Sequence, residues 1–267
     1  MIRMITIENT NWENQKLKNT KIFVFLFCFC ALVDNSFGYL SWERNDIFLQ
    51  GLSQLNSGDL DSAYDIFSQL KSDGYEQQKP FLLFVLGQTL RKRAKYNGRQ
   101  EDLQKALQCF LGYRELVFNS PEELKSAVVN IGYTYLALNE YQGGMKIIDN
   151  YLDSIKPNLD PDVLVCKAYL YNAYGFTVFN SKEKPDKAVQ YFETAYNIRH
   201  WPLFANNLIR CYLAMKPLNC QKINEVYSEF KGRSVWEDEY HFTGRAVEEV
   251  CGEVKGNIQK KKHKTEK

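Results

Sequence analysis

The sequence is poor in residues that break regular structure and in residues that most often carry chemistry. Its 267 residues include only 15 glycines, 7 prolines and 3 histidines. So little glycine and proline favours long regular elements over a turn-rich β protein. Lysine and arginine number 34 against 32 aspartates and glutamates, so the net charge is +2. This balance gives no reason to expect nucleic acid or an acidic membrane as the partner.

The sequence also lacks the common catalytic and cofactor-binding patterns. It contains no glycine-rich phosphate loop and no Gly-x-Ser-x-Gly nucleophile elbow. The histidines are His200, His241 and His263, and none lies four residues from another. That spacing excludes a pair of metal ligands on one helix. We therefore expect a protein that is not an enzyme and that binds no cofactor and no metal.

The N-terminal segment predicts export. An apolar run of 12 residues extends from Ile22 to Val33, and lysines precede it. A membrane-spanning helix requires about 20 apolar residues, so the run better fits the central region of a secretory signal peptide. Small residues in Ser36–Gly38 offer a cleavage site. We expect residues 1–38 to be a signal peptide, with an uncleaved membrane anchor or a buried core helix as the alternatives.

Five cysteines follow this segment, and their number is odd. Their spacings show no pair of the metal-binding kind. Export would permit disulfides, but small buried apolar side chains are the favoured interpretation. The absence of an Asn-x-Ser/Thr sequon favours a bacterial envelope over a eukaryotic secretory pathway. The five cysteines are Cys109, Cys166, Cys211, Cys220 and Cys251.

A repeated pattern of small residues predicts pairs of helices. A glycine, usually after an apolar residue, recurs at Gly51, Gly87, Gly132 and Gly175. Each is followed by a small residue with a large apolar residue four positions later, a spacing that places both on one helix face. These second signatures are Ala63 and Phe67, Ala106 and Phe110, Gly144 and Ile148, and Ala188 and Phe192. A small residue on each helix would let two backbones approach closely, so each glycine is expected at a helix–helix contact.

The unit "AVVNIGYTYLALNEYQGGMKIIDNYLDSIKP" resembles the tetratricopeptide repeat (TPR) family. The family pattern runs Trp-x2-Leu-Gly-x2-Tyr, then Ala-x3-Phe, then Pro. The resemblance covers about Asp46 to Phe230 and implies an all-α fold, an α-solenoid of about four to five helix-turn-helix (TPR-like) repeats. Gly87 and Ala106 are further apart than in the family, which implies a longer turn or longer helices there. The fifth unit, from Asn207, is degraded and lacks its glycine.

A helix is expected to close the solenoid at its C-terminal end. After Phe230, apolar residues form one helical stripe, and acidic residues supply a polar face, as a capping helix requires. We therefore expect the solenoid to occupy residues 39–258 and residues 259–267 to form a disordered basic tail. The stripe consists of Val247, Val250, Cys251, Val254 and Ile258.

The resemblance also implies where a partner binds. First helices line the concave side of such a solenoid, so their exposed side chains are the candidates. Aromatic rings supply contact area and amides satisfy main-chain groups, a combination that suits a protein or peptide ligand. We name this set the first-helix surface. It consists of Phe84, Gln88, Arg91, Asn130, Tyr133, Asn172, Phe176, Asn206 and Arg210.

Two classes of function follow from these observations. The first is an exported scaffold that binds a protein or peptide in the cell envelope or outside the cell, and it would be secreted, periplasmic or anchored by an uncleaved signal. The second is an intracellular TPR chaperone or adaptor for a secretion or assembly system. A cleaved signal peptide distinguishes them, because the second class should lack one.

Overall fold

The computed structural model describes residues 40–156, 159–181 and 185–252. The described residues form twelve α-helices and one short 3-10 helix, without β-strands. The helices are α2 (Leu40–Ser57), α3 (Leu60–Ser72), η1 (Tyr75–Gln77), α4 (Phe81–Asn97), α5 (Gln100–Leu116), α6 (Pro121–Leu138), α7 (Tyr141–Ser154), α8 (Pro161–Asn180), α9 (Pro185–Ile198), α10 (Pro202–Ala214), α11 (Cys220–Phe230), α12 (Ser234–Glu239) and α13 (His241–Cys251). The predicted all-α class is confirmed.

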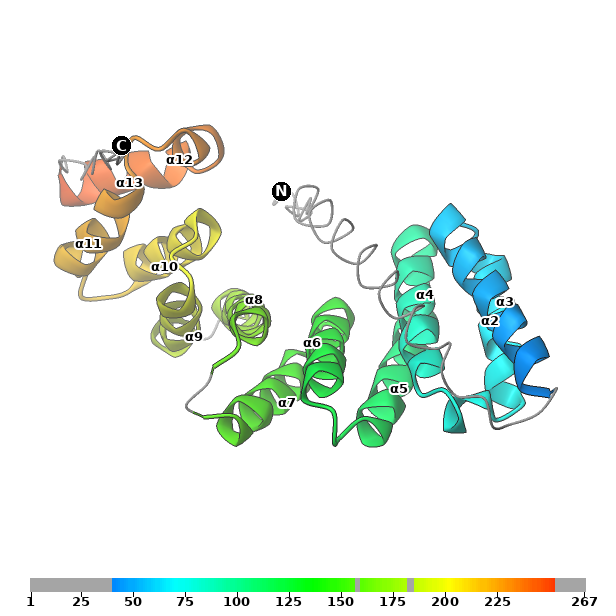
Figure 1. Ribbon diagram of the computed structural model, residues 1–267. Helices are drawn as coiled ribbons and strands as arrows, with labels where there is room; N and C mark the ends of the chain where they lie inside the picture. Colours follow the sequence, from blue (N-terminus) through cyan, green and yellow to red (C-terminus); the bar gives the residue numbers. More distant parts are fainter. Residues whose placement is uncertain (1–39, 157–158, 182–184, 253–267) are drawn as a thin grey trace, which may run out of the picture. The chain divides into compact units, whose positions relative to one another are not determined.

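The chain divides into two compact units, residues 1–49 and 50–267, and the packing described below is that of the second unit. Successive helices pair as antiparallel hairpins, α4 with α5, α6 with α7, α8 with α9 and α10 with α11 (Figure 1). Each hairpin also contacts the next, since α8 packs on α6 and α7, and α10 packs on α8 and α9. This is the predicted TPR-like α-solenoid.

Proline, aspartate and glycine set the helix ends. Pro121, Pro161 and Pro202 each occupy the first turn of a helix, where proline costs no hydrogen bond. The Asp160 carboxylate accepts from the first backbone N–H groups of α8, which stabilises the helix start.

The second hairpin confirms the expected extra length and shows where it lies. Helices α4 and α5 have 17 residues each, and only two residues separate them. Gly98 ends α4 in the left-handed conformation, with φ of 66°. Glycine adopts this conformation without steric cost, so the chain reverses within two residues. The additional residues therefore lengthen the helices and not the turn.

The repeated glycines lie at helix–helix contacts, as predicted. A Cβ atom added to each glycine would press on the large residue of the second signature in the same hairpin. The distances would be 2.5 Å to Phe67 at Gly51, 2.8 Å to Phe110 at Gly87, 3.1 Å to Ile148 at Gly132 and 3.1 Å to Phe192 at Gly175. At Gly132 the added atom would also lie 2.6 Å from Cys166 Sγ on α8. The glycine thus allows close contact both within a hairpin and between hairpins.

Replacing Gly132 by leucine should lower the free energy of unfolding by about 1–3 kcal/mol, because the side chain overpacks the contact with Ile148 and Cys166. Urea denaturation followed by circular dichroism measures the change. Ala137→Leu is the matched control, since it lengthens an exposed side chain on the same helix. Equal stability of the two variants would contradict a close helix contact at Gly132.

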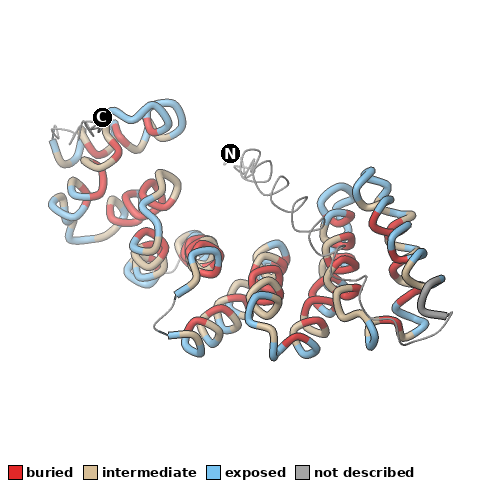
Figure 2. The backbone as a smooth tube through the Cα atoms, viewed as in Figure 1, coloured by how far each residue is buried: buried red, intermediate tan, exposed pale blue. Residues whose placement is uncertain are grey.

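Buried residues lie where each helix meets its neighbours, and exposed residues lie on the outer sides (Figure 2). The largest fully buried side chains include Phe110, Phe192, Phe204, Phe230 and Trp236. Burying one such ring contributes about 1.5–3 kcal/mol. The core is therefore a series of contacts between hairpins, as expected for a chain in which each repeat touches only its neighbours.

The C-terminal region differs from the predicted continuous stripe. Two helices, α12 and α13, replace one, and Tyr240 lies between them. Val247 is buried as predicted, but Val250 is 54% exposed, so that part of the prediction is wrong. The inner face of α13 is set by Gly244, Val247 and Cys251, and Val250 lies about 100° away from Cys251 around the helix.

Several predictions concern residues outside the described ranges. These are the signal peptide at residues 1–38, the basic tail at 259–267, and the stripe positions Val254 and Ile258. Within the described part of the chain, no helix combines the length and apolar character needed to cross a membrane.

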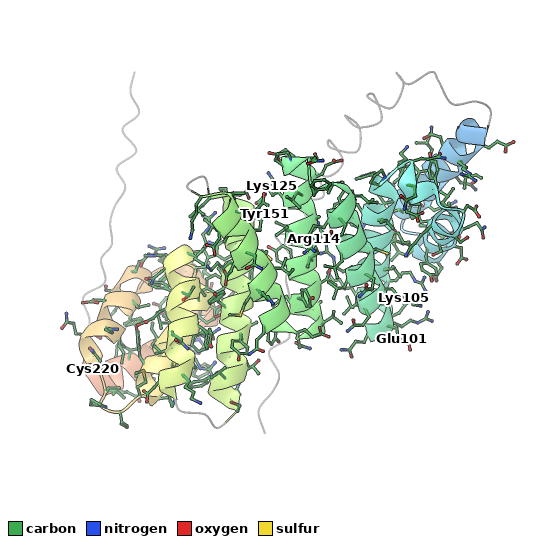
Figure 3. The ribbon with its side chains drawn as sticks, turned by 90° about the horizontal axis from the view of Figure 1, so that it is seen from below. Glu101, Lys105, Arg114, Lys125, Tyr151 and Cys220 are labelled. Atoms are coloured by element: carbon green, nitrogen blue, oxygen red, sulfur yellow. A yellow bond between two sulfur atoms is a disulfide. The ribbon has the colours of Figure 1, made fainter. Side chains whose placement is uncertain are left out.

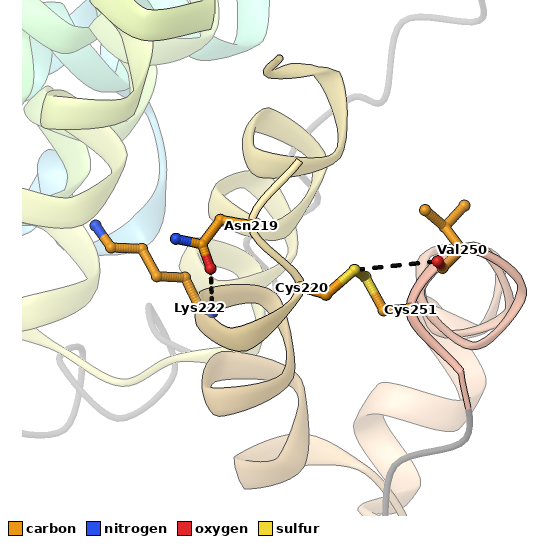
Figure 4. The surroundings of a disulfide bond; sticks show 5 residues. All are labelled: Asn219, Cys220, Lys222, Val250 and Cys251. Carbon is orange, nitrogen blue, oxygen red and sulfur yellow. Dashed lines mark hydrogen bonds between the residues drawn. A yellow bond between two sulfur atoms is a disulfide. The ribbon is translucent and has the colours of Figure 1, made fainter. Parts of the chain in front are cut away.

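The cysteines only partly follow the prediction of small buried side chains. Cys109, Cys166 and Cys211 are buried thiols. Burial raises the pKa of the Cys211 thiol to about 12, so this thiol is protonated and unreactive at neutral pH. Cys220 and Cys251 instead form a disulfide between α11 and α13, with Cα atoms 5.3 Å apart (Figure 4). The interpretation was wrong for this pair, because the two cysteines are 31 positions apart in the sequence and no local pattern reveals their contact.

Candidate partner-binding surface

The nine residues of the first-helix surface lie on four first helices, as predicted. Helix α4 carries Phe84, Gln88 and Arg91, α6 carries Asn130 and Tyr133, α8 carries Asn172 and Phe176, and α10 carries Asn206 and Arg210. Their environments differ: the asparagines are buried, Phe176 and Arg210 are exposed, and the others are half-buried.

The three asparagines are engaged within the protein. Asn130 Nδ2 donates to the Ser126 carbonyl of its own helix at 2.8 Å. Asn172 Oδ1 accepts from Asn207 Nδ2 at 3.0 Å, which joins α8 to α10. A buried amide that loses its partner costs about 1–3 kcal/mol. A ligand backbone would have to displace these bonds before it could use the asparagines.

The hydrogen bonds extend from α10 to the last described helix. Asn207 Oδ1 lies 3.5 Å from Asn206 Nδ2, and Asn206 Oδ1 accepts from Thr243 Oγ1 at 2.6 Å. A continuous polar chain therefore crosses α8, α10 and α13. Since amides and hydroxyls bond only in a narrow range of geometries, this chain fixes how the three helices lie against one another.

The predicted aromatic residues of α4 and α6 are packed and not fully exposed. The Phe84 ring lies 5.9 Å from Phe110 and 5.3 Å from Tyr113, measured between centroids. Tyr133 packs against the cluster between α6 and α8, and burial raises its pKa. The expectation that Tyr133 is an exposed residue outside the core is therefore wrong. The positive charge of Arg91 lowers the Tyr133 pKa and partly offsets the effect of burial.

Three aromatic residues that the sequence analysis did not select continue from Tyr133. The Tyr169 ring lies 6.5 Å from Tyr133, 5.7 Å from Trp201 and 5.5 Å from Phe204. Rings at such separations attract one another in tilted and edge-to-face arrangements. The signal for Tyr169 was its position one helical turn before Asn172. Trp201 directly precedes α10 and carried no such signal.

Phe176 is the one large apolar residue of the first-helix surface with a substantial exposed area, 44% of its side chain and backbone. Arg210, on the next first helix, is exposed as well. Exposed rings and arginines are the residue types most enriched at protein interfaces. These two residues are therefore available to a partner without disturbing the core.

Several charged residues lie outside the first-helix surface. Lys125 Nζ lies 2.7 Å from Glu122 and 3.3 Å from Asp160, so it joins α6 to the start of α8. Glu101 and Lys105 extend from α5 into solvent (Figure 3). The Lys125 ion pairs therefore hold two helices together, whereas Glu101 and Lys105 are solvated.

Histidine and acidic side chains do not assemble into a metal site in the described residues. No group of three or more histidine, cysteine, aspartate or glutamate residues there could hold a metal ion. His200 Nδ1 lies 3.0 Å from Glu229, and its ring stacks on Tyr196 at 4.4 Å. The arrangement thus joins the α9–α10 turn to α11, a structural contact.

The chain matches no protein-family model and no curated protein. Among solved structures, it is similar to a thermophilic TPR protein from Thermus thermophilus. The two share 20% sequence identity over 76% of this chain and 98% of that chain, with a TM-score of 0.32. The TPR-like α-solenoid is recognised from the helix hairpins and their glycine contacts, and not from this similarity.

Proposed function

We propose that the chain is an exported, non-enzymatic scaffold that binds a protein or peptide partner on the first-helix surface. Stacked helix pairs offer extended surfaces to such partners. The proposal rests on the exposure of Phe176, an aromatic residue on a first helix that is 44% exposed. Leaving it in water forgoes the favourable burial of an aromatic side chain, which a partner would recover.

The disulfide supports the exported form of the scaffold. Disulfides form and persist in secreted and periplasmic compartments and are rare in the cytosol. Cys220 and Cys251 form one between two helices that otherwise meet through few buried residues. This agrees with the N-terminal segment, which independently predicts a secretory signal.

Phe176→Ala should weaken binding of the partner by about 1–3 kcal/mol, roughly 5- to 150-fold in Kd, the range for a buried aromatic anchor. The partner is captured from the natural source with the wild-type protein, identified, and titrated by calorimetry against each variant. Phe118→Ala is the control, because Phe118 is 66% exposed in the α5–α6 turn, away from the first-helix surface. Equal Kd values for wild type and Phe176→Ala would place the binding site elsewhere.

Tyr133→Ala serves a different purpose in this experiment. Because Tyr133 is packed, its removal should lower stability as well as affinity, so it cannot by itself identify a contact with the partner. A melting temperature measured beside each Kd separates the two effects. Phe176→Ala should leave the melting temperature nearly unchanged.

Export is tested with a reporter enzyme that is active only outside the cytoplasm, fused after Gly38. We expect activity with the natural N-terminal segment and loss of activity when Leu26 is replaced by arginine, which interrupts the apolar run. A reporter that stays inactive with the natural segment would favour the intracellular adaptor.

A further inference from the structure

Helix α13 occupies the position of a first helix in the series of hairpins. It contacts α10 and α11, just as α8 contacts α6 and α7 (Figure 1). A Cβ added to its Gly244 would lie 2.9 Å from Tyr227 Oη, so this glycine also marks a close contact. In residues 40–156, 159–181 and 185–252, no helix follows α13 to complete the pair.

The outward face of α13 carries two exposed apolar side chains in line along the helix. Phe242 is 72% exposed and Val250 is 54% exposed, with the half-buried Ala246 midway between them. Positions four and eight residues apart form one ridge along a helix, the ridge that packs most often against another helix. A helix that ends a solenoid normally presents a polar outer face. We name Phe242, Ala246 and Val250 the α13 ridge.

The charged residues beside the ridge could pair with the same residues of a second α13 helix. Arg245 and Glu249 are exposed and lie on the same flank of the ridge. Arg245 reaches over the Phe242 ring at 5.7 Å and leaves most of that residue exposed. If two α13 helices met antiparallel about a two-fold axis near Ala246, each Phe242 would face a Val250. Each Arg245 would then lie beside a Glu249 of the other helix, because the two-fold axis preserves the flank.

We propose that the α13 ridge is a docking surface for a second copy of this chain, in an antiparallel, two-fold symmetric contact. Alanine at the centre lets the helices approach closely, and the paired charges set the direction. Opposite charges on one flank favour a self-complementary partner over an unrelated apolar helix. This inference does not depend on what the first-helix surface binds.

Charge exchange tests the proposal. Sedimentation velocity of the mature protein over a range of concentrations should show a reversible monomer–dimer equilibrium. Arg245→Glu and Glu249→Arg should each weaken dimerisation at least tenfold, since each creates two like-charge contacts. The double variant, with both substitutions, should restore the wild-type dimerisation constant, because the charges again match.

Phe242→Glu should abolish the dimer, whereas Phe118→Glu, at another exposed phenylalanine, should leave it unchanged. Circular dichroism melting confirms that each variant folds as the wild type does. A protein that remains monomeric at every concentration would overturn the proposal. Failure of the double variant to recover, or a ridge that binds only a different protein, would overturn it as well.

Discussion

Replacing Arg93 by methionine is expected to lower the free energy of unfolding by about 3–5 kcal/mol. Arg93 lies on α4 with only 7% of its surface exposed. Its Nε atom lies 3.4 Å from Asp102 on α5 and 3.1 Å from Asp61 on α3. The guanidinium carbon also lies 4.1 Å from the centre of the Tyr64 ring. One cation therefore joins three helices.

The size of this effect comes from the aspartate that would be left behind. Asp102 is 4% exposed, whereas the Asp61 side chain is 76% exposed and can be solvated. Without Arg93, Asp102 would be a buried charge with no compensating cation. This uncompensated charge, more than the lost attraction, accounts for most of the loss in free energy of unfolding. Urea denaturation at neutral pH measures it.

Two further variants separate charge from packing. Arg99→Met removes an exposed cation from the nearby turn and should change stability by no more than about 0.5 kcal/mol. The pair Arg93→Met with Asp102→Leu removes both buried charges and should recover much of the loss, as apolar replacements of buried ion pairs do. If the pair is no more stable than Arg93→Met alone, the cost arises from packing and not from an uncompensated charge.

Breaking the Cys220–Cys251 disulfide is expected to lower the free energy of unfolding by about 3–4 kcal/mol, from the chain entropy of a loop of this length. The two cysteines are 31 residues apart, so the bond restricts the unfolded chain over much of the last two repeats. It also holds α13 against α11, where Gly244 and Val247 are the buried residues of α13.

The measurement is urea denaturation with and without a dithiol reductant, which reduces the disulfide to two thiols and becomes oxidised itself. The variant with both Cys220→Ala and Cys251→Ala is the control, and the reductant should not change its stability. Identical denaturation curves of the wild type in both conditions would show that the two thiols are not joined.

The glycine contacts were predictable from sequence because both partners carry a local signal. Gly87 and Phe110 belong to a spacing pattern that repeats along the chain. Residues spaced by the helical period lie on one face of a helix, so the pattern determines which faces meet. The longer second hairpin was also visible, as an altered spacing. The choice between longer helices and a longer turn was not, because it depended on Gly98 adopting a left-handed conformation.

The contacts between repeats could not be predicted in this way. Asn172, Asn206 and Thr243 lie on three helices, and their hydrogen bonds depend on the rotation of each helix about its own axis. The disulfide depends on the path of α12 between α11 and α13. Phe176 and Tyr133 each follow a repeated glycine by one residue, yet one is exposed and the other packed. Neighbouring helices decide this difference, and the spacing does not report it.

The intact mass of the protein, purified from its natural source without reductant, tests the exported scaffold most directly. We expect the mass of a chain that begins at Tyr39 and lacks the two hydrogens lost when Cys220 and Cys251 join. The same sample treated with reductant should gain those two hydrogens. A chain that retains the residues before Tyr39, with every cysteine reduced, would contradict export.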